Sequence, residues 1–220
     1  MKLQTVQKQQ LLHSAVRYGT VHSELSTVAP RSRSESRGYG VDAFETVIAA
    51  ILQRQGYWTQ INLKVCLTKE DKRLIGRNSS PRWELDVVAF DARNNDIIVV
   101  ECKSLLDSRG VAIKTLDGTD EKSKKRYKLF TDNKLREIVF HRLQQQLIYD
   151  GFCKHRPTVH LGLAAGKICG DGEQLHALFK ANDWLLLDPH CIQRELKKLC
   201  NSSYENDVTT MVVKLLLRMP

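Results

Sequence analysis

The chain has 220 residues, of which 42% are hydrophobic, so it is long enough and apolar enough to bury a core and does not have the composition of a disordered polypeptide. No run of about 18 apolar residues is present and the N-terminal stretch lacks the apolar core of a signal peptide, which predicts a cytoplasmic protein without a membrane span. The excess of 34 Lys and Arg over 25 Asp and Glu gives a net charge of +9 and predicts a polyanionic partner, nucleic acid before an anionic membrane surface.

The N-terminal part of the chain differs in composition from the rest. Residues 2–18 are predicted to form a short polar helix, and residues 20–38, which are rich in Ser and Arg, a mobile linker. We therefore predict two parts: an N-terminal helix and linker over residues 1–39, and a compact domain with C-terminal helices over residues 40–220.

The compact domain is predicted to start with an amphipathic helix over residues 42–55. Asp42 is placed to cap the start of this helix, and Gly56 is placed to end it. The apolar residues that recur at helical spacing along one face are Phe44, Val47, Ile48, Ile51 and Leu52.

Alternating and β-branched segments then predict three strands, over residues 57–67, 82–91 and 96–102. The last two flank the turn-forming sequence DARNND, so we expect them to pair as a hairpin. The later elements are predicted in the order helix 132–149, strand 158–165, helix 172–181, strand 184–187, and helices 191–199 and 204–218. This order predicts an α/β fold in which helices flank a mixed central sheet.

Three charged residues occupy unusual places in the expected hairpin. Asp86 lies within its first strand, and Glu101 and Lys103 end the second, after the continuously apolar residues 97–100. Side chains two apart share a face of a strand, so Glu101 and Lys103 project together while Cys102 points into the opposite layer. An exposed ion pair is the plainer alternative, but charges that end a buried strand need partners. Two neighbouring carboxylates with a divalent cation between them meet that need, so the pattern favours one shared site.

The same residues resemble the motif of the PD-(D/E)xK nuclease superfamily. The motif here consists of Leu85-Asp86, fourteen intervening residues, and Glu101-Cys102-Lys103, with Leu85 where the motif's name has proline. The resemblance implies a restriction-endonuclease-like core, with a helix, three strands, a helix and a strand in the order expected here. It also implies that Asp86 and Glu101 ligate Mg²⁺ or Mn²⁺, that the backbone carbonyl of Cys102 is a further ligand, and that Lys103 is the catalytic lysine.

A helix acid that precedes the hairpin joins the metal site in many members of this superfamily, and Glu45 resembles it. The spacing of Asp42 and Glu45 is also that of a capping box, in which Glu45 bonds back to the start of its own helix. The sequence leaves both roles open, because an acid in the first turn of a helix can still face the sheet.

Residues 121–136 carry seven basic residues against two acids. A solvated helix face is the plainer interpretation, and a grip on the DNA backbone is the alternative if the segment lies near the catalytic strand. Residues 145–149 are similar to the Gln-x-x-x-Tyr element of exonuclease-type relatives, although a solvated polar face is the plainer interpretation of them. The candidate DNA-binding residues are Lys122, Lys124, Lys125, Arg126, Lys128 and Gln145.

The residues and the resemblance together predict an endodeoxyribonuclease that depends on Mg²⁺ or Mn²⁺, with restriction or phage defence as the first role considered. A Holliday-junction resolvase or a repair nuclease is the alternative role. A catalytically silent DNA-binding module is the alternative from a different class. The predicted terminal helices offer a surface for a homodimer or for a partner subunit.

Overall fold

A computed structural model describes residues 42–76, 82–120, 125–203 and 206–218 of the chain. The helix and linker predicted for residues 1–39 therefore lie outside the described residues. Within the described ranges, no helix combines the length and the apolar character that crossing a bilayer requires.

Helix α2 (Ala43–Arg54) forms where the sequence predicts it. The Asp42 carboxylate accepts hydrogen bonds from the backbone N–H groups of Phe44 and Glu45, at 2.7 and 3.3 Å, and so caps the first turn. Gly56 follows the helix at a φ of +94°, a left-handed conformation that glycine adopts without steric cost. The buried residues of α2 are Glu45, Ile48, Ala49, Ile51 and Leu52.

Five strands form one mixed sheet in the order β1-β2-β3-β4-β5. They are β1 (Trp58–Cys66), β2 (Arg82–Asp91), β3 (Asp96–Lys103), β4 (Thr158–Ala165) and β5 (Leu185–Leu187). The first three are antiparallel neighbours, whereas β3, β4 and β5 run parallel. The carboxyl ends of these three parallel strands therefore meet at the same edge of the sheet, where β3 ends on Lys103.

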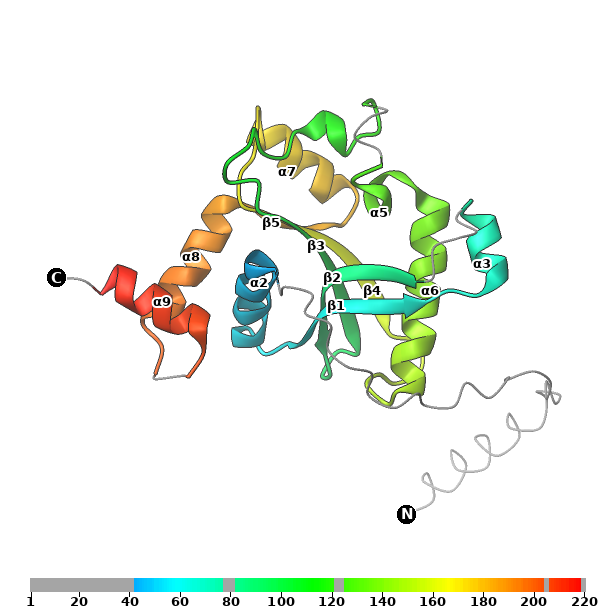
Figure 1. Ribbon diagram of the computed structural model, residues 1–220, viewed down its shortest axis with the longest axis horizontal. Coiled ribbons are helices and arrows are strands. Elements are labelled where there is room, and N and C mark those ends of the chain that lie inside the picture. The colour runs from blue at the N-terminus through cyan, green and yellow to red at the C-terminus, as the bar shows by residue number, and fades with distance from the viewer. Residues whose placement is uncertain (1–41, 77–81, 121–124, 204–205, 219–220) are drawn as a thin grey trace, which may run out of the picture. The chain divides into compact units, whose positions relative to one another are not determined.

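Helices cover both faces of the sheet, and each face has its own apolar core. Helices α2, α8 (Pro189–Cys200) and α9 (Val208–Leu217) pack on one face. Helices α6 (Asn133–Tyr149) and α7 (Gly172–Ala181) pack on the other, and Figure 1 shows α2 and α6 on opposite sides of the strands. The predicted α/β architecture, a mixed central sheet flanked by helices, is thus confirmed.

Three short elements are additional to the sequence prediction: α3 (Lys69–Leu74), the 3-10 turn Ile113–Thr115 and α5 (Lys128–Thr131). In α3 the Thr68 hydroxyl accepts from the Asp71 N–H at 3.1 Å, and the Asp71 carboxylate accepts from the Thr68 N–H at 2.8 Å. This capping box stabilises a helix of six residues that is too short to show a hydrophobic period.

Asp71 also ties α3 to α6. Its carboxylate accepts from Nε and Nη2 of Arg142 at 2.6 and 3.2 Å, and the residue is only 7% exposed. Burial alone raises the pKa of Asp71, but the hydrogen bonds from Arg142 and Thr68 outweigh burial, so the pKa lies below its ordinary value of 3.8. Arg142 and Asp71 therefore form a bidentate ion pair at neutral pH.

We expect Asp71→Asn to lower the free energy of unfolding by about 1–3 kcal/mol at pH 7, because Arg142 then loses its ionised partner. Since the folded pKa is depressed, the ion pair contributes fully above the pKa of an unfolded aspartate, and this contribution is lost as the pH falls through the folded pKa. Urea denaturation at pH 7 and at the lowest pH at which both proteins stay folded should show the difference between them shrinking in acid. A difference that does not change with pH would contradict the assignment.

Candidate metal and catalytic site

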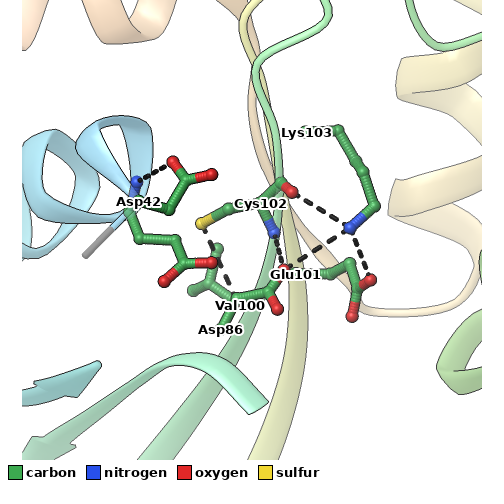
Figure 2. A network of polar contacts seen from close by, with 7 residues as sticks. Asp42, Asp86, Val100, Glu101, Cys102 and Lys103 are labelled. Atoms are coloured by element: carbon green, nitrogen blue, oxygen red, sulfur yellow. Dashed lines mark hydrogen bonds and ion pairs between the residues drawn. The ribbon is translucent and has the colours of Figure 1, made fainter. Parts of the chain in front are cut away.

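The charged residues of the hairpin meet at the carboxyl end of β3. Lys103 Nζ lies 2.7 Å from Glu101 Oε1 and 3.5 Å from Asp86 Oδ2. It also lies 3.0 Å from the carbonyl oxygen of Cys102, as Figure 2 shows. Three oxygens from two strands therefore converge on one ammonium group.

The antiparallel pairing of β2 and β3 produces this convergence. Val87 pairs with Val100, so the next residue outward on each strand, Asp86 and Glu101, lies at the same level of the sheet. The Asp86 carboxylate then accepts a hydrogen bond from the backbone N–H of Cys102 at 2.7 Å. Because this bond ties the carboxylate to β3, Asp86 faces the end of β3 and is not left to solvent.

The site is partly shielded from water, and this strengthens the electrostatic interactions between its charged side chains. The side chains of Lys103, Asp86 and Glu101 are 24%, 22% and 18% exposed. Burial raises the pKa of Glu101 above its ordinary value despite the lowering effect of Lys103. Burial lowers the pKa of Lys103, but the negative charges of Glu101 and Asp86 more than offset this, so the Lys103 pKa is raised. In this arrangement Lys103 is a cation and a hydrogen-bond donor, and it is not poised as a general base.

Glu45 approaches the cluster from the α2 face of the sheet. It is 8% exposed, and its pKa is raised to about 7, first by burial and then by the negative charges of Asp86 and Asp42. The positive charge of Lys103 acts on Glu45 in the opposite direction. The Asp42 carboxylate caps α2. Glu45 is buried toward the sheet, where the charges of Asp86 and Lys103 both change its pKa.

Cys102 contributes its backbone to the site and its side chain to the core. The residue packs against the core beneath α2. Burial first, and then the charges of Asp86 and Glu45, raise the pKa of the Cys102 thiol well above its ordinary value, so the thiol stays protonated. The carbonyl oxygen is therefore the group that Cys102 offers at the end of β3.

The donor set suits a hard divalent cation. Two carboxylates and a backbone carbonyl are the oxygen donors that Mg²⁺ and Mn²⁺ prefer, and they converge on a position where Lys103 already places a positive charge. Among the residues that the structure describes, no cluster of three or more His, Cys, Asp or Glu side chains is arranged to hold a metal. A cation here would thus take two carboxylates from the protein and complete its shell with the carbonyl, waters or phosphate oxygens, after displacement of the ammonium group.

Tyr127 lies beside the site, although nothing in the sequence singled it out. It is 5% exposed, and burial raises its pKa against the opposing charge of Lys103, a hydrogen bond with Thr115 and the charge of Arg126. Tyr127, which belongs to the basic segment, therefore lies near the end of β3. A lone tyrosine among lysines forms no pattern, so only the fold reveals this neighbourhood.

The basic segment is described in part. Lys122 and Lys124 lie outside the described residues. Lys125 and Arg126 are exposed, and Lys125 and Lys128 line an open groove of about 420 Å³ with residues from the start of α6. Arg126 is next in sequence to Tyr127, whose pKa responds to the charge of Lys103, so this part of the basic segment lies near the end of β3.

Gln145 is not brought to the charged cluster by any contact that the structure describes. It lies on the exposed side of α6, where its side chain accepts from Arg142 Nη1 at 2.8 Å and lies 3.4 Å from a ring nitrogen of His141. The neighbouring Gln146 faces the sheet instead, accepting from the N–H of Cys66 at 3.2 Å and donating to the carbonyl of Lys64 at 3.3 Å. The DNA-binding role of Gln145 stays a prediction.

Comparisons with known proteins add one structural likeness. No protein-family model and no curated protein matches the chain. A crystal structure of a protein of unknown function, AF1548, is similar over 78% of this chain and 76% of that chain, at 14% sequence identity and a TM-score of 0.37.

Proposed function

We propose that the chain is a metal-dependent endodeoxyribonuclease with a restriction-endonuclease-like core. The observation that carries this proposal is the convergence of Asp86, Glu101 and the Cys102 carbonyl on Lys103 at the end of a buried strand. Partial burial of the charges of Asp86, Glu101 and Lys103 costs desolvation free energy, and an ion cluster that served stability alone would not recover much of that cost. The net charge of +9 and the basic segment beside the site favour DNA as the substrate.

Each residue has a distinct role in the proposed reaction. Asp86 and Glu101 would hold Mg²⁺ or Mn²⁺, with the carbonyl of Cys102 as a further ligand and Glu45 supporting the same site or a second ion. The bound cation would supply positive charge against the phosphate oxygens during attack by water. Lys103, released from its carboxylate partners, donates to a phosphate oxygen and stabilises the charge that develops there.

The biological role that we favour is restriction or phage defence, and the alternative is a Holliday-junction resolvase or a repair nuclease. The first requires loops that read base edges, for which residues 104–131 are the candidate. The second requires a dimer with two sites set for symmetric cuts. A catalytically silent DNA-binding module would bind the same substrates without cutting them.

The test is a cleavage assay on three substrates: supercoiled plasmid, linear duplex and a four-way junction. Each is incubated with wild type or with Asp86→Asn in the presence of Mg²⁺, Mn²⁺ or EDTA. Cutting by wild type alone, and only with metal, supports the nuclease, and the preferred substrate separates restriction from resolution or repair. Binding without cutting under every condition would point to the silent module and overturn the proposal.

DNA affinity should fall steeply as the salt concentration rises, because neutralised phosphates release counterions. We expect the double variant Lys125→Glu, Arg126→Glu to weaken binding to every duplex alike and to reduce the log–log salt slope by about 1 for each phosphate that is no longer neutralised. Fluorescence anisotropy over a range of salt concentrations measures both quantities. Lys197→Glu, a charge reversal at an exposed position of α8, is the matched control, and equal losses of affinity in the two proteins would reject the basic segment as the DNA-binding surface.

A further inference from the structure

Asn62 has a backbone conformation that is rare inside a strand. Its φ of +55° lies in the left-handed region, and among the described strand residues no other non-glycine residue has a positive φ. Asparagine tolerates this region better than most residues, but the conformation is still strained relative to a regular strand. A strain that the fold maintains in the middle of β1 needs a compensating role.

The direction of the side chains reverses along β1 at Asn62. Residues two apart share a face in a regular strand. Here Ile61 packs on the core beneath α2, whereas Leu63 belongs to the core beneath α6. The left-handed conformation of Asn62 therefore lets Ile61 and Leu63, two residues apart, point to opposite faces of the sheet.

The same reversal occurs on β2 at the same level. Leu85 belongs to the core beneath α6 and Val87 to the core beneath α2, with Asp86 between them. Ile61 pairs with Val87 and Leu63 with Leu85, so Asn62 and Asp86 are the two residues that lie between these pairs. The irregularity of β1 is thus paired with the residue of β2 that carries a carboxylate to the end of β3.

The Asn62 side chain connects this irregularity to Glu45. The Asn62 amide is assigned with its nitrogen toward the two nearby carboxylates, because the opposite orientation would turn its oxygen toward acceptors only. In this orientation Asn62 Nδ2 donates to Glu45 Oε2 at 3.1 Å and to Glu84 Oε1 at 3.2 Å. Glu45 is buried, whereas the Glu84 side chain is 51% exposed, so the bond to Glu45 is the one that restrains a shielded group. One amide therefore holds the α2 acid at the level of the sheet where Asp86 lies.

We infer that Asn62 is a positioning residue of the proposed active site. Its left-handed backbone accommodates the change of face at the level of Asp86, and its amide holds the Glu45 carboxylate toward the sheet at that level. The consequence for catalysis rests on the proposed nuclease function, whereas the restraint on Glu45 does not.

Two substitutions separate the backbone from the amide. Asn62→Gly accepts the left-handed conformation without strain and removes only the amide, whereas Asn62→Ala removes the amide and adds a strained Cβ. For Asn62→Gly we expect kcat with Mg²⁺ to fall by about 10–100-fold, the loss typical when a group that orients a ligand is removed, while KM for DNA changes by less than about twofold. The rise in Tm that Mg²⁺ produces should also be smaller for Asn62→Gly than for wild type. In EDTA, Asn62→Ala should unfold several degrees below Asn62→Gly.

A double-mutant cycle in EDTA tests the restraint on Glu45 without metal or DNA. Glu45→Leu removes the acceptor and fills the buried space. Asn62→Gly should shift Tm by clearly different amounts in the wild-type and Glu45→Leu backgrounds, because only the first holds the buried acceptor of the Asn62 amide. The contact with Glu84 and the change in backbone freedom contribute to both backgrounds and cancel in the comparison. Additive Tm shifts would overturn the inference, as would a full kcat for Asn62→Gly. If wild type neither binds Mg²⁺ nor cuts DNA, the proposed function fails, and the cycle alone then decides whether Asn62 holds Glu45.

Discussion

Lys103→Met is expected to lower kcat for metal-dependent DNA cleavage by roughly 10²–10³-fold or more, with little change in DNA affinity. The ammonium group is the cation on which Glu101, Asp86 and the Cys102 carbonyl converge, and methionine keeps the length of the side chain while removing the charge. Asp86→Asn should be comparably severe, because it weakens a proposed metal ligand and the acceptor of the Cys102 N–H. Single-turnover cleavage of a labelled duplex with excess enzyme measures the loss.

The Lys103→Met variant should also differ from wild type in how its Tm responds to metal. Without Lys103, the carboxylates of Asp86 and Glu101 repel each other in a partly shielded site, so the variant should unfold below wild type in EDTA. Adding Mg²⁺ should then raise the Tm of Lys103→Met by more than it raises that of wild type, since the cation no longer competes with an ammonium group. Lys197→Met, at an exposed position of α8, is the control and should change neither quantity. Cleavage by Lys103→Met within tenfold of wild type would remove Lys103 from the catalytic machinery.

The central strands of the sheet were predictable from the sequence because they are covered on both faces. The strand predicted for residues 158–165 is β4 (Thr158–Ala165), and the strand predicted for residues 96–102 extends by one residue to form β3 (Asp96–Lys103). In β3, Ile97 and Val100 are fully buried on opposite faces, which produces the continuous apolar run that marks such strands. Most of the strand positions could therefore be predicted from the local pattern of apolar residues.

The features that the sequence did not predict depend on partners that are distant along the chain. Helix α3 combines a local capping box between Thr68 and Asp71 with an ion pair from Asp71 to Arg142, 71 residues away, and no local pattern in the sequence indicates the ion pair. The left-handed conformation of Asn62 has no sequence signature either, because asparagine is also common in ordinary strands and turns. Both features become visible only when the sheet and α6 are in place.

The candidate site was accessible in part for the same reason. Asp86, Glu101 and Lys103 lie on two adjacent strands joined by a short turn, so the period of two along each strand was sufficient to expect them together. The role of Glu45 was open between capping and the sheet, and its burial follows from the packing of α2. Gln145 was chosen from a local resemblance, and its contacts on the exposed side of α6 show why a helical polar residue needs the fold to assign its face.

Glu45 makes the metal-free protein less stable as the pH rises. Its folded pKa of about 7, against an ordinary value of 4.5, means that folding favours the protonated acid. The penalty for ionising it in the folded state is absent below the unfolded pKa, grows between pH 4.5 and 7, and is complete above the folded pKa. That difference in pKa corresponds to about 3 kcal/mol. Glu101, whose pKa is also raised, adds to the trend in the same direction.

We therefore expect the free energy of unfolding of wild type in EDTA to fall by about 2–3 kcal/mol between pH 5.5 and pH 8.5, and Glu45→Gln to remove most of that fall. Urea denaturation at a series of pH values measures it, with Glu137→Gln, an exposed acid on α6, as the control that should behave as wild type. Saturating Mg²⁺ should reverse the trend for wild type, because a cation binds the ionised carboxylates. Stability in EDTA that rises with pH, or a Glu45→Gln variant with an undiminished fall, would show that Glu45 is not held in a shielded, acidic cluster. Under the proposed function, binding of the cation offsets the cost of ionising this buried acid.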